Sequence, residues 1–310
     1  MTNSRKKNDN RFAVILAGGD GSRLKSLTKT IAGDDRPKQF CPILNGETLL
    51  DVTRKRAALK IAPENTFFSL TQKHKHFYES HLSDVPKNRQ IVQPENKGTA
   101  PAILYSLMKL PLDATVAFFP SDHYFSDDKA FMDNVEAAFH SSEMNASSII
   151  LLGIAPEEAE TSYGWIEPVE SLFGGVSKAV SRVKRFWEKP SSEAASYLMS
   201  KGCLWNSFVM VGKVEIFLDL YKKHLPELYK AFEEAGEFFE TSVENALIRS
   251  LYSRMVETNF SSEVLEKASE DLYVLRVGDV GWSDWGEPQR VLGTLEMLGV
   301  QMDWMRAVAA

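Results

Sequence analysis

A glycine-rich loop that follows directly on a short apolar run limits the possible folds more than any other stretch of this chain. The run Phe12–Leu16 has the length and the apolar composition of a buried β-strand. The stretch LAGGDGSRL, residues 16–24, then places three glycines within four positions. Glycine lets the backbone approach a ligand closely, and successive backbone N–H groups can point at phosphate oxygens. The stretch therefore predicts a strand that ends in an anion-binding loop, with Arg23 as a planar donor to phosphate.

Two familiar nucleotide-binding fingerprints do not fit this loop. A G-x-G-x-x-G pattern that starts at Gly19 would put Leu24 at its last position, and no Gly-Lys-Ser/Thr follows at Walker spacing. The simpler alternative is a tight strand-to-helix turn with a solvated Arg23. The loop alone does not distinguish a phosphate site from such a turn, so the choice between the two interpretations depends on other stretches of the sequence.

Strands and helices are predicted to alternate in the first half of the chain. Short apolar runs predict strands over Phe12–Leu16, Thr66–Thr71, Ala114–Phe119 and Ser147–Gly153. Helical spacing of apolar residues predicts helices over Thr99–Leu110 and Asp127–His140. Such alternation favours an α/β fold with helices on both faces of a sheet. Ligands of these sheets bind beyond the carboxyl ends of the strands.

The second half has a mixed pattern. Strands are expected over Ser162–Pro168, Ala179–Glu188, Leu204–Val211 and Asp271–Val277. Helices are expected over Val214–His224, Pro226–Ala235, Thr241–Thr258 and Glu287–Leu298. We therefore expect a flexible polar tail over residues 1–11 and a single domain over residues 12–310 that ends in a C-terminal helix.

Composition argues against some classes of partner. The formal net charge is -6, whereas a surface that binds a phosphate backbone is basic, so we expect no nucleic acid partner. No apolar run approaches the ~18 residues of a membrane span, so we expect no membrane partner. Cys41 and Cys203 have no metal-binding spacing, and the polar first eleven residues lack the apolar core of a signal peptide. We therefore expect a cytoplasmic protein with reduced cysteines.

Three polar stretches in the first half lie where a ligand could be held. RPKQF, residues 36–40, puts two cations beside a proline in a loop. QPENKGTAPAI, residues 93–103, precedes a predicted helix N-terminus, where an anion or a base edge can bind. FFPSDHYF, residues 118–125, ends an apolar strand with Asp122, and a carboxylate at that position can hold Mg²⁺.

Two further polar stretches lie in the second half. FWEKP, residues 186–190, ends a predicted strand with Glu188 and Lys189. GWSDWG, residues 281–286, places Asp284 between two tryptophans. Each has an ordinary alternative, because Glu-Lys pairs are common on surfaces and Asp284 could cap the helix expected from Glu287.

Taken together and in this order, the motifs resemble those of the sugar-1-phosphate nucleotidyltransferases. The resemblance runs from about Phe12 to Gly286, most of the chain. Its Pro-Lys-Gln-Phe, Thr-Ala-Pro-Ala-Ile and Ser-Asp-His motifs resemble the mannose-1-phosphate guanylyltransferase branch in particular. The resemblance implies a Rossmann-like, GT-A-like α/β fold with a central mixed, mostly parallel sheet flanked by helices. Gly98 and Ser261 depart from the usual pattern, so the choice of base and sugar stays open.

The resemblance also implies which residues form the site. The nucleotide would contact Leu16, Ala17, Gly18, Gly19, Gly21, Ser22, Gln93 and Thr99. The sugar would contact Gly164, Glu188 and Asn206. The catalytic residues would be Arg23, Lys38, Asp122, Lys189 and Asp284.

The implied reaction joins a nucleoside triphosphate, expected to be GTP, to a hexose-1-phosphate, expected to be mannose-1-phosphate. The sugar phosphate attacks the α-phosphorus in line, giving GDP-mannose and pyrophosphate. Arg23 with Lys38 would balance the β- and γ-phosphates, and Lys189 would bind the sugar phosphate. Mg²⁺ would be the cofactor, held by Asp122 and Asp284. The resemblance leaves a homodimer open.

Three alternative functions remain at this point. The chain could use another hexose-1-phosphate or another triphosphate, it could be a glycosyltransferase of related fold, or it could be a sugar-nucleotide sensor without activity. A glycosyltransferase would use Ser121–His123 as its metal motif, but it has no leaving pyrophosphate for Arg23 and Lys38 to balance. Both aspartates and both lysines are present, which argues against a sensor.

Overall fold

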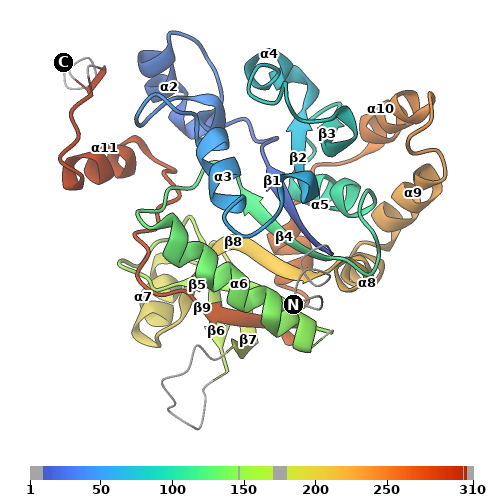
Figure 1. Ribbon diagram of the computed structural model, residues 1–310. Helices are drawn as coiled ribbons and strands as arrows, with labels where there is room; N and C mark the ends of the chain where they lie inside the picture. The colour runs from blue at the N-terminus through green and yellow to red at the C-terminus, as the bar shows by residue number, and fades with distance from the viewer. Residues whose placement is uncertain (1–9, 146, 170–179, 303, 306–310) are drawn as a thin grey trace, which may run out of the picture.

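The computed structural model describes residues 10–145, 147–169, 180–302, 304 and 305. In this part of the chain, no helix combines the length and the apolar character needed to cross a membrane. The described strands form one nine-stranded sheet in the order β3-β2-β1-β4-β8-β5-β9-β7-β6 (Figure 1). The strands are β1 Arg11–Leu16, β2 Thr66–Thr71, β3 Gln90–Gln93, β4 Thr115–Pro120, β5 Ile149–Ile154, β6 Gly164–Pro168, β7 Val180–Glu188, β8 Leu204–Lys213 and β9 Leu272–Arg276.

The sheet is mixed, as the resemblance implied. Strands β3, β2, β1 and β4 pair in parallel, so their carboxyl ends meet at one edge. Strand β8 is antiparallel to β4, β5 and β6, and β7 is antiparallel to β6 and β9, while β5 and β9 are parallel. The expectation of a mostly parallel sheet is therefore correct only for the first half. In the second half, β6 and β7 are consecutive antiparallel neighbours, which need no crossover helix.

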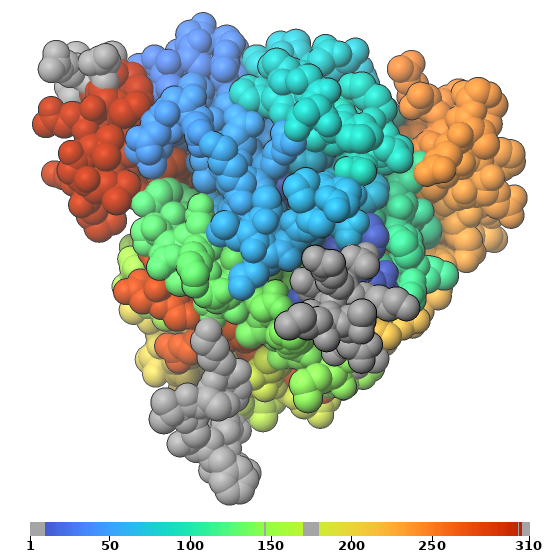
Figure 2. Space-filling model, viewed as in Figure 1, coloured from blue at the N-terminus to red at the C-terminus, as the bar shows by residue number. Residues whose placement is uncertain are grey.

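Helices cover both faces of the sheet. They are α2 Lys25–Ala32, α3 Leu49–Ala57, α4 Lys75–Tyr78, α5 Thr99–Leu107, α6 Asp128–Met144, α7 Ser192–Ser200, α8 Val214–His224, α9 Pro226–Gly236, α10 Glu244–Arg254 and α11 Pro288–Met297. Three helices begin after a residue whose side chain accepts a hydrogen bond from a backbone N–H of the first turn. Thr48 caps α3, Asp127 caps α6 and Ser191 caps α7 in this way. In the space-filling view, α9 and α10 form one edge of the molecule and α11 lies at the opposite edge, beside α2 (Figure 2).

Alternate side chains of the strands build a separate apolar core on each face. On β1, Ala13 and Ile15 belong to a first core that includes side chains of α3, α6 and α7, whereas Val14 belongs to a second core that includes side chains of α5, α8 and α10. A third, smaller cluster joins α2 to α11 through Leu27 and Leu295. The two large cores hold the sheet rigid, and a rigid sheet is what positions side chains at its edge.

The structure corrects the predicted tail. Residues 1–9 lie outside the described part of the chain, but Arg11 begins β1 and is only 2% exposed. Its guanidinium lies 2.6 Å from Glu143 and 2.8 Å from Glu136, and it stacks on Phe139. The Arg11 guanidinium, which was expected to be solvated, can be buried because two carboxylates of α6 pair with it. The helix expected over 241–258 is also shorter, and it runs from Glu244 to Arg254.

Candidate active site

The glycine-rich loop leaves the carboxyl end of β1 and is held by side chains from two other segments. Gln39 donates to the carbonyl oxygens of Ala17, at 3.1 Å, and of Gly19, at 2.7 Å. The Thr71 hydroxyl donates to the carbonyl of Gly18 at 2.9 Å. A Cβ on Gly18 would lie 2.9 Å from that hydroxyl oxygen, so the position requires glycine. These bonds occupy the loop carbonyls, and the N–H of Ala17 donates to the carbonyl of Ser69 at 2.8 Å, so a ligand would be bound by N–H groups further along the loop.

A cavity of about 320 Å³ opens at the carboxyl ends of the parallel strands. Ligand pockets of this size hold small molecules. It is lined by Leu16, Gly18, Gly19, Ser69, Gln93, Asn96, Gly98, Thr99, Ala102, Pro120, Asp122, Phe208, Glu257 and Asn259. The structure thus brings five of the predicted nucleotide-binding residues and one predicted metal ligand around one space, in accordance with the rule for α/β sheets.

The residues predicted to read the base already bind other parts of the protein. The Gln93 amide donates to Ser69 at 3.2 Å, and the Tyr252 hydroxyl donates to the Gln93 carbonyl oxygen at 3.3 Å. The Thr99 hydroxyl oxygen accepts from the backbone N–H of Phe260 at 2.8 Å. The direct contacts of Gln93 and Thr99 with a base therefore stay predictions.

The structure explains why position 98 is a glycine. Its φ is 88°, a left-handed conformation, and a Cβ there would lie 2.4 Å from the carbonyl oxygen of Thr258. The backbone of the 255–260 segment thus packs directly against Gly98, and any side chain would displace it.

Lys38 joins the two predicted metal ligands. It is 4% exposed, and its ammonium group lies 3.0 Å from Oδ2 of Asp122. The same group donates to the backbone carbonyls of Asp284 and, at 3.1 Å, of Trp285. All three ammonium protons therefore have protein acceptors, and the contact of Lys38 with phosphate stays a prediction. Burial opposes ionisation of Asp122, but the charges of Lys38 and His123 and the hydrogen bond from Lys38 together outweigh it and hold the pKa of that carboxyl below its ordinary value.

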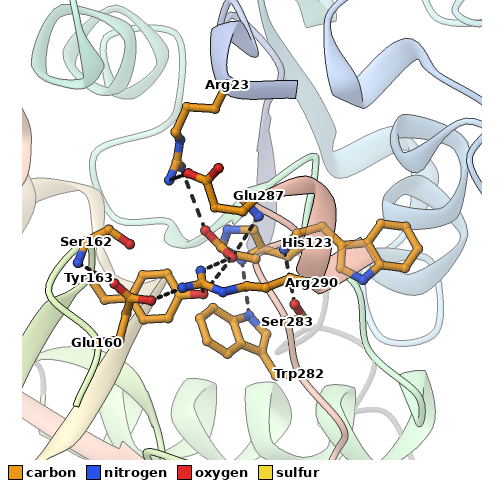
Figure 3. A network of polar contacts seen from close by, with 12 residues as sticks. Arg23, His123, Glu160, Ser162, Tyr163, Trp282, Ser283, Glu287 and Arg290 are labelled. Atoms are coloured by element: carbon orange, nitrogen blue, oxygen red, sulfur yellow. Dashed lines mark hydrogen bonds and ion pairs between the residues drawn. The ribbon is translucent and has the colours of Figure 1, made fainter. Parts of the chain in front are cut away.

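Asp284 is the centre of a buried polar network, and its partners Tyr163, Arg290 and Arg23 are labelled in Figure 3. Its Oδ1 accepts from the Tyr163 hydroxyl at 2.6 Å, the Arg290 guanidinium at 2.9 Å and the backbone N–H of Gly286 at 2.8 Å. Arg23 lies 3.8 Å from Oδ2. The helix-cap alternative is wrong, because Glu287 occupies the cap position of α11 and no side chain bonds the first turn there.

The two aspartates fit a magnesium ion. Carboxylate oxygens are the donors that Mg²⁺ prefers, and it commonly takes one or two carboxylates with phosphate oxygens and water completing its shell. Oδ2 of Asp284 has only the long contact with Arg23, and Oδ1 of Asp122 has only His123 at 3.9 Å. Among the described residues, no group of three or more His, Cys, Asp or Glu side chains could hold a metal. The donor set therefore suits an ion that is shared with substrate phosphates.

The three predicted sugar-binding residues lie on neighbouring strands. Gly164 pairs with Glu188 across β6 and β7, and Trp165 pairs with Trp205, which precedes Asn206 on β8. A Cβ on Gly164 would lie 3.2 Å from Glu188 Oε2. Burial raises the pKa of Glu188, which is partly offset by Lys189.

Two predicted cations stay exposed at the site. The Lys189 side chain is 59% exposed, with its ammonium group 3.8 Å from Glu188. The Arg23 side chain is 54% exposed, with Glu287 at 3.6 Å. Long contacts of exposed chains cost little to exchange, so both cations can turn toward an anionic ligand.

Sequence reasoning missed Tyr163, Arg290 and Gln39. Arg290 also pairs with Glu160 and stacks over the Tyr163 ring, and these contacts join α11 to the loop before β6 (Figure 3). Tyr163 precedes the predicted Gly164 directly, and Gln39 follows Lys38 directly. That adjacency was the one signal available for Tyr163 and Gln39, and Arg290 follows Asp284 by six positions with no motif to mark it.

The chain matches the profile of one protein family over most of its length. That family is described as Nucleotidyl transferase, and the matched residues run from 12 to 296. Mannose-1-phosphate guanylyltransferase 2 of Escherichia coli O157:H7 is 29% identical over 290 residues, 90% of this chain and 58% of that protein. Mannose-1-phosphate guanylyltransferase of Salmonella montevideo is 28% identical over 280 residues, 88% of this chain and 57% of that protein. The chain thus spans somewhat more than half the length of these relatives.

Solved structures show the same architecture. A Thermus thermophilus protein named mannose-1-phosphate geranyltransferase aligns with a TM-score of 0.79 at 27% identity, over 94% of this chain and 80% of that one. A Helicobacter pylori protein named mannose-6-phosphate isomerase aligns with a TM-score of 0.68 at 23% identity, over 88% of this chain and 99% of that one. The second likeness concerns the fold alone.

Proposed function

Because this chain belongs to the nucleotidyl transferase family of enzymes, we propose that it transfers the guanylyl group of GTP to mannose-1-phosphate, giving GDP-mannose and pyrophosphate. The main observation behind the proposal is the position of Lys38, whose ammonium group binds both Asp122 and the backbone carbonyl of Asp284. Asp122 and the glycine-rich loop line the same cavity. The names of the guanylyltransferase relatives support the choice of sugar and base.

The reaction needs positive charge and positioning more than a base, because two anions must approach each other. The loop N–H groups bind the triphosphate, and Arg23 exchanges its long contacts with Asp284 and Glu287 for phosphate oxygens. Lys189 binds the sugar phosphate and aims its oxygen at the α-phosphorus. A bond forms from that oxygen to the α-phosphorus as the bond to the pyrophosphate oxygen breaks.

Asp122 and Asp284 would hold the magnesium ion. When bound, that ion supplies charge neutralisation for the phosphates. Lys38 keeps the carboxylate of Asp122 ionised and ties its strand end to the 284–285 backbone. Tyr163 and Arg290 orient Asp284 through Oδ1. These three are positioning residues in the proposal.

Glu188, Gly164 and Asn206 would face the sugar, with the partly buried Glu188 carboxylate accepting from its hydroxyls. A Cβ at position 164 would lie 2.8 Å from the Phe186 ring and 3.2 Å from Glu188 Oε2, so Gly164 lets its strand pack against both side chains. Both cysteines are free and buried, which suits the reducing cytoplasm that we propose as its location.

The experiment is a pyrophosphate-release screen of four nucleoside triphosphates against several hexose-1-phosphates, with Mg²⁺ present. We expect GTP with mannose-1-phosphate to be the best pair. A preference for UTP or dTTP with glucose-1-phosphate would keep the reaction and overturn the substrates. Release of nucleoside diphosphate from a nucleotide sugar, with no pyrophosphate formed from any pair, would indicate a glycosyltransferase instead.

A further inference from the structure

His123 lies beside both proposed metal ligands, although no role has been given to it so far. It follows Asp122 directly in the sequence. The next residue, Tyr124, forms an antiparallel bridge with Ser283, through backbone hydrogen bonds of 2.9 Å and 3.1 Å. In an antiparallel pair, the residue before one partner lies across from the residue after the other, which places His123 across from Asp284. The bridge therefore fixes the backbone of His123 next to both aspartates.

Trp282 determines which nitrogen of His123 carries the proton. The Trp282 indole N–H donates to Nδ1 of His123 at 3.3 Å, and the two rings lie nearly perpendicular (Figure 3). An indole nitrogen can only donate, so Nδ1 must be the acceptor and carries no proton. A neutral imidazole has one N–H group, which is then on Nε2. The contact with Trp282 thus holds His123 in the Nε2–H tautomer.

The Nε2–H of His123 is free to bind a ligand. Among the described residues, Nε2 has no hydrogen-bond acceptor, because Oδ1 of Asp122 is 3.9 Å away and too distant. The side chain is 12% exposed, and Nε2 itself is not enclosed by protein, so a ligand can reach it. The two ring nitrogens point to nearly opposite edges of the imidazole, so Nε2 is turned away from Trp282 and toward Asp122. Asp122 lines the cavity of about 320 Å³ at the strand ends.

We propose that His123 is a further catalytic residue, whose Nε2–H donates a hydrogen bond to a substrate phosphate oxygen bound beside Asp122. This inference rests on the proposed function, because it needs a phosphate at that place. Arg23 and Lys189 are exposed and must move to reach a phosphate, and Lys38 has no free proton. His123 instead supplies a donor that is already fixed in position, which is the kind of donor that stabilises developing charge at the lowest cost.

Two phosphates come together in the proposed reaction, the α-phosphate of the nucleotide and the phosphate of the sugar. Both offer the same anionic oxygens to Nε2, and each substrate can be added without the other, so that no reaction occurs. The readout is nitrogen-15 NMR of the whole chain with labelled histidine, which shows directly which ring nitrogen is protonated. The chain has six histidines, and the signals that disappear in His123→Gln are those of His123.

We expect a proton on Nε2 of His123 and none on Nδ1 at neutral pH. Addition of GTP with Mg²⁺, or of mannose-1-phosphate, should shift the Nε2–H signal, and the substrate that does so identifies the phosphate in contact. A proton on Nδ1 in place of Nε2 would overturn the proposal. So would an unchanged Nε2–H signal with both substrates and with GDP-mannose, when calorimetry shows that they bind.

Kinetics of matched variants test the contribution to turnover. His123→Leu should lower kcat/KM by about tenfold or more, because it removes a hydrogen bond to a charged acceptor. His123→Gln should keep most of the activity, because its amide oxygen can accept from Trp282 while its NH₂ group donates to phosphate. The exposed His140→Leu is the control for loss of a histidine. Equal activity of His123→Leu and His123→Gln would overturn the proposal.

Trp282→Phe tests the tautomer, because it removes the indole donor and keeps an aromatic ring. It should admit the Nδ1–H tautomer of His123 in the NMR spectrum and lower kcat/KM several-fold. Thermal unfolding identifies a variant that has not folded, and the NMR spectra of the unaltered chain then decide the question. Failure of the proposed function has a different result, because the unaltered chain would then release no pyrophosphate from any substrate pair. An active parent enzyme with an equally active His123→Leu variant would refute the role of His123 alone.

Discussion

The Tyr163 hydroxyl donates a 2.6 Å hydrogen bond to Oδ1 of Asp284, although 121 positions separate the two residues. Asp284 is 8% exposed, so this bond is made in a largely dry environment. It occupies Oδ1 and leaves Oδ2, 3.8 Å from Arg23, as the oxygen available to a metal ion. The orientation of a proposed metal ligand is thus set by a tyrosine outside the recognisable motifs.

Tyr163→Phe should lower kcat several-fold, because the ring stays in place while the bond that orients Asp284 is lost. We expect a stability loss of about 1 kcal/mol, as for a single buried hydrogen bond. The apparent affinity for Mg²⁺ should fall, and excess Mg²⁺ should restore part of the rate. The exposed Tyr197→Phe serves as control. An unchanged Mg²⁺ dependence would mean that Tyr163 is only a packing residue.

Asp122→Asn and Asp284→Asn should each lower kcat by about 100-fold, because a neutral amide is a poor ligand for Mg²⁺. The double variant should lose less than the product of the single losses, since both aspartates act through one ion. Asp284→Asn should also lose stability, by about 1–3 kcal/mol, because it leaves Arg290 with a weaker buried partner. Near-normal turnover of Asp284→Asn at saturating Mg²⁺ would refute the shared ion.

Lys189→Ala should reduce kcat/KM for the sugar phosphate by roughly 10- to 150-fold, the range for a lost charge-assisted contact of about 1.5–3 kcal/mol. Arg23→Ala should act chiefly on the nucleoside triphosphate. Both side chains are more than half exposed, so neither change should disturb folding. Lys129→Ala, on the surface of α6, is the control for a lost charge. Identical profiles of the two variants against both substrates would contradict this division of roles.

The stability should fall as the pH is lowered through the ordinary histidine pKa, partly because of His74. Burial lowers the pKa of His74 below its usual 6.5, and the nearby Asp20, 3.2 Å away, only partly offsets this. Below pH 6.5 the unfolded chain therefore binds a proton that the folded chain does not. The stability from neutral His74 is present above pH 6.5 and is lost as the pH falls toward the folded pKa.

His74→Gln should make the free energy of unfolding less dependent on pH between about pH 7.5 and about pH 5.5. Urea unfolding at the two pH values measures this difference. The exposed His140→Gln is the control for replacement of a histidine elsewhere on the protein. An equal slope in all three proteins would exclude His74 as a source of the pH dependence.

Much of the fold could be predicted, because the apolar residues that a strand or helix buries follow a short-range pattern in the sequence. The runs at β1, β2, β4 and β5 each contain at least three apolar residues in six, and the structure buries them between two cores. The short β3 was missed because its four residues, QIVQ, include only two apolar ones. Those glutamines are buried because their amides find partners: Gln90 donates to the carbonyls of Leu82 and Val85, and Gln93 donates to Ser69.

The strand and loop at residues 11–24, the order of the motifs and hence the family could all be read from the amino-acid sequence, because each depends on residues close together in the chain. The packed chain was needed to see that Lys38 has no free proton and that Arg290 and Tyr163 share one oxygen of Asp284. It was also needed to see that Trp282 donates to His123. Those facts depend on how the segment before α11 and α11 itself pack beside the sheet. A contact such as that of Tyr163 with Asp284, 121 positions apart, leaves no periodicity in the sequence between them.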